Sequence, residues 1–97
     1  MKLRLLPRAQ RNLLEVQAWL EREQPQSSER QLDIIIMGLD QLGRHPLSAP
    51  TCRDERLALR GFRTITLGRY VAFYKVQRAT VYVYRMLNQK QSWKPLL

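Results

Sequence analysis

The chain has 97 residues, a hydrophobic fraction of 44% and a formal net charge of +9. This length and composition fit one globular domain over residues 1–97 and exclude two domains or a disordered chain. A single cysteine, Cys52, excludes an internal disulfide and predicts a reducing compartment. No apolar run approaches the ~20 residues of a membrane span and no secretion signal is visible, so we expect a cytoplasmic protein without a membrane partner.

Residues 2–6 predict the first element, a half-buried strand, because Leu3 and Leu5 alternate with basic residues. Pro7 suits the first turn of a helix, which then follows from Arg8 to Glu23 and is ended by Pro25. Its apolar residues recur at helical spacing and form one stripe: Ala9, Leu13, Val16 and Leu20, widened by Leu14 and Trp19.

A second helix is predicted after Ser27 or Ser28, either of which can cap it. Gly43 is its expected C-terminal cap, and Pro46 lies just beyond. Helical spacing places five residues in the core: Leu32, Ile35, Ile36, Leu39 and Leu42. The two amphipathic helices predict a helical hairpin whose apolar face needs a sheet to cover it.

The rest of the chain predicts a loop over residues 44–56 and then three strands. The strands are rich in β-branched and aromatic residues: Phe62–Leu67, Tyr70–Val76 and Val81–Leu87. Gly68 and residues 77–79 suit hairpin turns, which predicts an antiparallel meander, and Ser92–Leu97 form a tail. We therefore predict an α+β fold, a helical hairpin packed on a small antiparallel sheet formed by the first strand and the meander, in the order β-α-α-β-β-β.

The basic residues are concentrated in the second half of the chain. Residues 1–55 contain eight basic and eight acidic residues, whereas residues 56–97 contain nine basic and no acidic ones. A one-sided positive field attracts a polyanion or an acidic protein segment. Solubility is the alternative explanation, but it does not require acidic residues to be absent from so long a stretch.

Motifs for metal, cofactor or nucleophilic chemistry are missing. One histidine and one cysteine cannot form a zinc site without several carboxylates, and no Gly-rich phosphate loop occurs. Cys52 has no evident histidine partner and is interpreted as a structural thiol, and His45 as a surface residue. We expect no metal, no cofactor and no catalytic residue.

Several segments, in this order, resemble the RelE/ParE toxins, and more closely those of the ParE branch. The first helix has the spacing Ala9, Leu13, Val16 followed by Trp19-Leu20, and the second ends in Leu42 followed by Pro46. The strands add Gly61-Phe62-Arg63, Tyr70–Val76 with its paired tyrosines, and Val83–Asn88. The resemblance extends over nearly the whole chain.

A ParE-like identity implies the toxin of a type II toxin–antitoxin system. Such a toxin inhibits growth by binding DNA gyrase and performs no covalent chemistry itself. Its partner is a ParD-like antitoxin whose acidic, partly disordered segment folds onto the toxin. Operator DNA is bound only through the antitoxin complex.

Departures from the superfamily pattern separate this reading from its alternatives. In RelE-type ribosome-dependent mRNA endoribonucleases an arginine follows the first tyrosine of the third strand, where this chain has Val71, and no tyrosine occurs after Tyr84. A ribonuclease using Lys75, Arg85 and Lys90 remains an alternative. Asn88 stands where ParE chains commonly have histidine, which leaves open a non-toxic relative that binds antitoxin alone.

The residues predicted to contact the target lie at the end of the chain: Arg85, Asn88, Lys90, Trp93 and Lys94. The residues predicted to contact the antitoxin are Arg63, Tyr74 and Trp19. Arg63 and Arg85 are expected on adjacent strands, where they would form one basic patch for carboxylates or, alternatively, would be charges that protect a sheet edge. Tyr70 and Tyr74 share a strand face, and at least one of them is expected to pack in the core.

Overall fold

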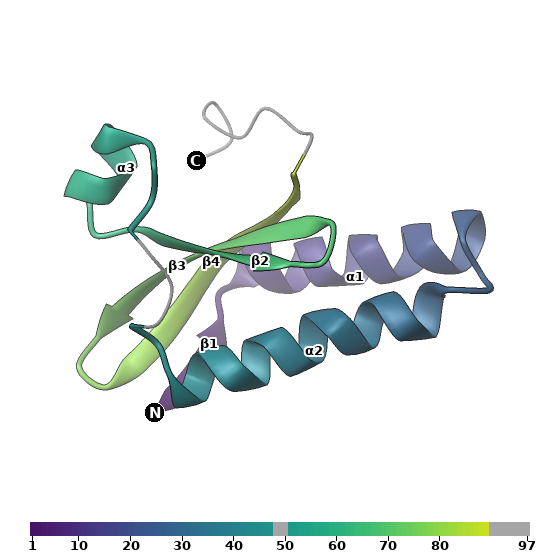
Figure 1. The fold of residues 1–97 in the computed structure, drawn as a ribbon, viewed down its shortest axis with the longest axis horizontal. Helices are drawn as coiled ribbons and strands as arrows, with labels where there is room; N and C mark the ends of the chain where they lie inside the picture. The colour runs from purple at the N-terminus through teal and green to yellow at the C-terminus, as the bar shows by residue number, and fades with distance from the viewer. Residues whose placement is uncertain (48–50, 90–97) are drawn as a thin grey trace.

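The computed structural model describes residues 1–47 and 51–89, and Figure 1 shows a two-helix layer against a twisted sheet. The helices and strands are β1 (Lys2–Leu5), α1 (Pro7–Glu23), α2 (Ser28–Arg44), α3 (Glu55–Leu59), β2 (Arg63–Leu67), β3 (Tyr70–Gln77) and β4 (Thr80–Asn88). The predicted order β-α-α-β-β-β is confirmed, and α3 is an additional short helix between α2 and β2.

The sheet has the strand order β1-β4-β3-β2. β2 pairs antiparallel with β3, and β3 antiparallel with β4, which confirms the predicted meander. β1, however, pairs parallel with β4, with Leu3 beside Val81, so the sheet is mixed and the prediction of a purely antiparallel sheet was wrong for β1. Alternation of side chains reports that a segment is a strand, and it carries no information about the strand's direction.

The two hairpin turns lie where they were predicted. Arg78 and Ala79 both have positive φ, 48° and 62°, which is the backbone of a two-residue type I′ hairpin. Gly68 has φ of 64°, and a Cβ atom there would lie 3.3 Å from Cγ2 of Ile34. Glycine therefore lets the β2–β3 turn lie close against α2.

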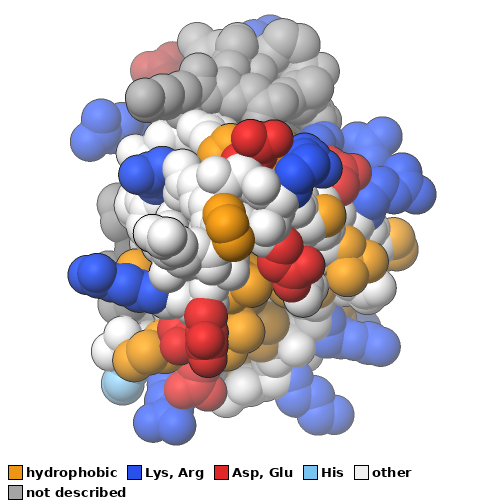
Figure 2. Space-filling view, turned by 90° about the vertical axis from the view of Figure 1, so that its right-hand side faces the viewer, with side chains coloured by type: hydrophobic (Ala, Val, Ile, Leu, Met, Phe, Trp, Pro, Cys, Tyr) orange, Lys and Arg blue, Asp and Glu red, His pale blue; other side chains and the backbone are white. Residues whose placement is uncertain are grey.

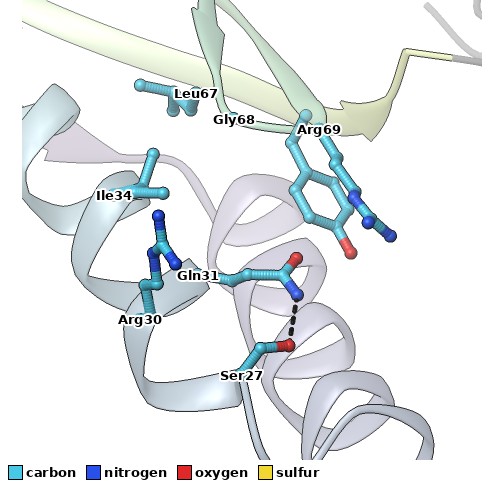
Figure 3. A pocket seen from close by; sticks show the side chains of 8 residues that line it. Ser27, Arg30, Gln31, Ile34, Leu67, Gly68 and Arg69 are labelled. Carbon is cyan, nitrogen blue, oxygen red and sulfur yellow. Dashed lines mark hydrogen bonds between the residues drawn. The ribbon is translucent and has the colours of Figure 1, made fainter.

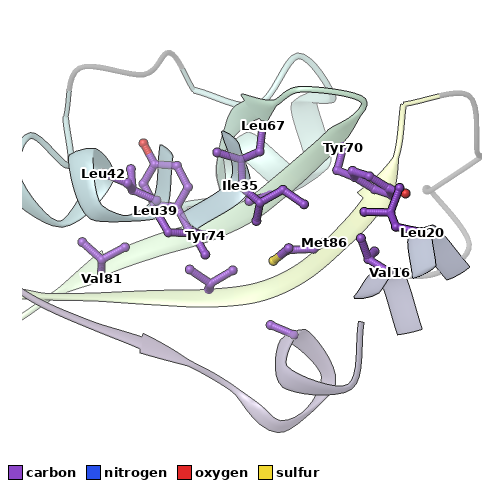
Figure 4. Close-up of a cluster of buried hydrophobic side chains, with 13 residues drawn as sticks. Val16, Leu20, Ile35, Leu39, Leu42, Leu67, Tyr70, Tyr74, Val81 and Met86 are labelled. Carbon is purple, nitrogen blue, oxygen red and sulfur yellow. The ribbon is translucent and has the colours of Figure 1, made fainter. Parts of the chain in front are cut away.

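The helices bury their apolar stripes against one face of the sheet (Figure 4). Ala9, Val16 and Leu20 of α1 are buried there, as are Ile35, Leu39 and Leu42 of α2. Ile36 is 57% exposed, so its predicted place in the core was wrong. Consecutive helical residues point about 100° apart, and Ile35 already faces the sheet.

The ends of α2 differ in detail from the prediction. Ser27 stands at the N-cap position, but its hydroxyl caps no backbone N–H and instead accepts a 2.9 Å hydrogen bond from Nε2 of Gln31. Gly43 is a buried residue inside the helix, which continues to Arg44 with His45 as its C-cap. A Cβ atom on Gly43 would lie 3.7 Å from Cβ of Leu3, so this glycine lies close to β1 rather than ending the helix.

The predicted loop over 44–56 ends earlier than expected because α3 begins at Glu55. Asp54 caps α3, accepting hydrogen bonds from the backbone N–H groups of Arg56 (3.0 Å) and Leu57 (3.2 Å). The helix covers a second apolar cluster on the opposite side of β3 from Tyr74, and the buried residues of this cluster are Cys52, Leu57, Phe62, Phe73 and Leu87. Cys52 is thus a buried thiol within a small core.

Tyr74 is fully buried, and its hydroxyl donates a 2.8 Å hydrogen bond to the carbonyl of Pro46. Burial raises the pKa of Tyr74 above 10.0, and nearby Arg63 only partly offsets this effect. The folded state therefore holds the phenolic proton more tightly than the unfolded chain does. Stability supplied by this group is complete below pH 10 and is lost as pH rises above it.

The Tyr74→Phe variant is expected to lose about 1–2 kcal/mol at neutral pH, since the Pro46 carbonyl loses its buried partner. Above pH 10 the gap to the parent protein should narrow, because phenylalanine has no proton to lose. Urea unfolding at pH 7 and pH 10.5 measures both effects. If the free energy of unfolding falls equally in the two proteins between pH 7 and pH 10.5, the raised pKa assigned to Tyr74 is contradicted.

Candidate functional site: a groove beside β4

An open groove of about 290 Å³ lies between α1 and the C-terminal half of β4. It exists because β1 pairs with β4 only as far as Val83, so the rest of that edge faces α1 without a strand between them. The residues that line this β4 groove come from α1, β3 and β4: Asn12, Glu15, Val16, Trp19, Tyr70, Arg85, Met86, Leu87 and Asn88. Three of the predicted contact residues, Trp19, Arg85 and Asn88, are thus brought together.

Asn12 holds Arg85 in this groove. Oδ1 of Asn12 accepts hydrogen bonds from Nε of Arg85 at 3.0 Å and from the backbone N–H of Met86 at 3.1 Å. The β3–β4 register shifts here, pairing Phe73 with Arg85 and Tyr74 with Val83, which leaves Tyr84 as the extra residue of a bulge. A bulge re-aims the side chains of its strand, and this one lies directly before Arg85.

Sequence reasoning missed Asn12, although a signal was present. Asn12 is a polar residue within the stripe that contains Ala9 and Val16, and only 9% of its surface is exposed. A polar side chain at a core-facing helical position needs a partner, because burial without one is costly. The sequence could therefore have predicted a buried hydrogen bond from α1 to the sheet.

Replacing Asn12 by alanine should lower the free energy of unfolding by about 1–3 kcal/mol, since the Met86 N–H and the Arg85 guanidinium lose their acceptor. Asn12→Asp should retain most of the stability because a carboxylate accepts both hydrogen bonds and pairs with the arginine. Thermal melting of both variants provides the measurement. The role assigned to Oδ1 is wrong if alanine and aspartate destabilise the protein equally.

The β4 groove offers the side chains of a protein-binding surface. Trp19 is 39% exposed, and the anchored guanidinium of Arg85 and the amide of Asn88 lie in the same groove. Tryptophan and arginine are enriched among residues that dominate binding energy. Across residues 1–47 and 51–89, no three His, Cys, Asp or Glu side chains gather as a metal-binding group.

The predicted antitoxin contacts Arg63 and Tyr74 lie elsewhere. They face each other across β2 and β3, and Tyr74 is buried, so its side chain is not available to a partner in this conformation. β3 separates β2 from β4, so the prediction that Arg63 and Arg85 lie on adjacent strands was wrong. Lys90, Trp93 and Lys94 lie outside the described residues.

Lys75 belongs to an aromatic cluster. Its Nζ lies 4.5 Å from the ring centroid of Phe62 and 5.3 Å from that of Tyr84. The two rings meet edge to face, with their centroids 5.0 Å apart. The amine of Lys75 thus lies over these rings, whereas Arg85 is hydrogen-bonded to Asn12 of α1, so the two described members of the suggested ribonuclease set have different partners.

The chain matches the family model described as the ParE toxin of the type II toxin–antitoxin system parDE, over residues 3–93. No curated protein sequence matches it. The solved structures that share its fold include two toxin–antitoxin systems. The chromosomal ParDE system of P. aeruginosa is 18% identical, with a TM-score of 0.71 over 91% of this chain and 95% of the other. The RelBE2 toxin–antitoxin complex of Mycobacterium tuberculosis is 22% identical, with a TM-score of 0.64 over 91% and 96%.

No helix in the described ranges has the length and apolar character needed to cross a bilayer. The predicted fold agrees with both solved structures, including the helix pair packed on a sheet in the order β-α-α-β-β-β. The family match extends from β1 through β4. The chain therefore belongs to the ParE family of type II toxin–antitoxin toxins.

Proposed function

We propose that this ParE-family toxin inhibits growth by binding DNA gyrase, and that the β4 groove takes part in the contact. The observation that carries the proposal is the combination in one open groove of exposed Trp19 with Arg85, fixed by Asn12. An anchored arginine loses little conformational entropy on binding, which favours tight association. Binding of this kind needs no covalent step by the toxin.

The partner that neutralises the toxin is a ParD-like antitoxin with an acidic, partly disordered segment. The two solved structures described above are both of toxin–antitoxin systems, which supports this partner. Trp19, assigned to the antitoxin, lines the same groove as Arg85 and Asn88, assigned to the target. An antitoxin segment in the groove would therefore exclude gyrase sterically. Both proteins act in the cytoplasm, and operator DNA is bound through the antitoxin.

A gyrase supercoiling assay with purified toxin tests the proposal directly. We expect the toxin to inhibit supercoiling and Arg85→Gln to be at least about tenfold weaker, the loss typical of one charged contact. Arg78→Gln, the same substitution at the β3–β4 turn, is the matched control and should inhibit like the parent protein. Absence of inhibition by a folded toxin would remove gyrase as the target.

An mRNA endoribonuclease is the main alternative. Adding the toxin to a translating extract and mapping message ends distinguishes the two activities, since reproducible cuts within codons would favour the ribonuclease. The engagement of Lys75 with the Phe62 ring and of Arg85 with Asn12 weighs against it. A non-toxic relative, suggested by Asn88, would leave growth unchanged when the protein is induced alone.

Deletion of Ser92–Leu97 is expected to abolish growth inhibition, because this segment contains Trp93 and Lys94. The truncated protein should still melt cooperatively, since it keeps the described helices and strands and the described members of the two buried clusters. Growth after induction and circular dichroism melting supply the two readouts. Loss of the cooperative transition would assign the segment a structural role instead.

A further inference from the structure

A second pocket lies between the start of α2 and the β2–β3 turn. It is lined by none of the residues that the sequence predicted to contact the target or the antitoxin. It measures about 280 Å³, and its lining residues are Ser27, Arg30, Gln31, Ile34, Leu67, Gly68, Arg69 and Tyr70. Tyr70 also lines the β4 groove, so the two cavities meet at this ring. The face of the molecule at the α1–α2 loop shows exposed hydrophobic side chains among both acidic and basic ones (Figure 2).

Two arginines flank this cavity on opposite sides, Arg30 on α2 and Arg69 on the turn, and we call it the arginine pocket (Figure 3). Both side chains are exposed, and within the described residues neither forms an ion pair with a carboxylate. Between them lie apolar groups, since Ile34 is partly exposed and Leu67 and Tyr70 are buried at the base. The pocket thus combines two uncompensated positive charges with an apolar floor.

Gln31 adds a hydrogen-bond acceptor of fixed orientation. Its Nε2 donates to Oε1 of Gln24 at 2.6 Å and to Oγ of Ser27 at 2.9 Å, so both amide hydrogens already have acceptors within the protein. The amide oxygen points toward the space between the arginines (Figure 3). A peptide backbone N–H can donate to that oxygen, whereas a bare phosphate dianion has no proton to offer.

We propose that the arginine pocket docks an acidic peptide segment of the antitoxin, with a carboxylate on each arginine and an aliphatic side chain between them on Ile34. This inference rests on the proposed function for the identity of the partner. The two arginine charges favour carboxylates, and the apolar base of the pocket favours an aliphatic side chain. The amide oxygen of Gln31 accepts a hydrogen bond from a backbone N–H of the peptide. Because Tyr70 borders both cavities, a segment anchored here is directed toward the β4 groove, where it would cover Trp19 and Arg85.

The test uses an acetylated hexapeptide of alternating glutamate and leucine as the probe, titrated into ¹⁵N-labelled full-length toxin. We expect the amide signals of Gln31, Gly68 and Arg69 to shift, and the glutamine–leucine analogue to bind roughly tenfold more weakly, because it lacks the charges. Arg30→Gln and Arg69→Gln should each weaken binding severalfold. Arg78→Gln, at the other end of β3, should bind like the parent.

Inorganic phosphate and a single-stranded oligonucleotide are titrated in parallel. Tighter binding of either than of the acidic peptide, equal binding of the two peptides, or an equal loss in Arg78→Gln would overturn the proposal. The same toxin samples enter the gyrase assay. If the toxin binds the peptide in the pocket but does not inhibit gyrase, the proposed target is rejected and the docking site is retained. If the toxin inhibits gyrase but does not bind the peptide in the pocket, the docking site alone is rejected.

Discussion

Phe73→Ala is expected to lower the free energy of unfolding by about 3–5 kcal/mol, the cost of removing a buried aromatic ring. Phe73 has no exposed surface and lies in the cluster under α3, where Phe62 and Leu87 also pack. The cluster is small, so little apolar material is available to fill the cavity. At about 4–8 °C per kcal/mol for a domain of this size, the melting temperature should fall by tens of degrees.

Leu59→Ala is the matched control for this substitution. Leu59 is the last residue of α3 and 88% exposed, so its truncation should change stability by less than about 0.5 kcal/mol. Calorimetric melting of the two variants beside the parent gives the comparison. A Phe73→Ala protein that melts near the parent temperature would show that the cluster under α3 contributes little to folding.

Trp19→Ala should weaken antitoxin binding by roughly thirtyfold, which corresponds to about 2 kcal/mol for an aromatic residue at the centre of an interface. The side chain lies at the β4 groove and is partly exposed before any partner binds. The antitoxin is taken as the product of the neighbouring gene, and calorimetric titration of the purified pair provides the dissociation constant.

Leu14→Ala tests whether this effect is specific to the groove. Leu14 is also an exposed apolar residue of α1, at 65% exposure, but it does not line the groove. The affinity of this variant should remain within about twofold of the parent value. Equal losses for Trp19 and Leu14 would point to a broad apolar surface instead of a defined groove.

Local features of the fold could be read from the sequence because local interactions determine them. The helical stripe of Ala9, Val16 and Leu20 requires a single buried face, and the turn at Gly68 requires a residue that tolerates positive φ. Features that depend on distant contacts were misread. Gly43 has the residue type of a helix cap, yet its position is decided by its approach to Leu3.

The candidate site was predictable only in part for the same reason. Trp19, Arg85 and Asn88 were identified by residue type and family resemblance, but their meeting in one groove depends on where β1 stops pairing with β4. The burial of Tyr74 could not be read from its strand, because it depends on a hydrogen bond to the distant carbonyl of Pro46. The arginine pocket could not be predicted because Arg30 and Arg69 lie far apart in the chain and come to line one cavity only where the β2–β3 turn at Gly68 packs near Ile34 of α2.

The parallel pairing of Lys2 with Thr80 has a consequence for biosynthesis. Ribosomes add about 5–20 residues per second, so the first strand waits roughly 4–16 seconds for its neighbour to be made. The edge of β4 that borders α1 is completed later still. The β4 groove is thus expected to form only after translation of the chain has almost finished.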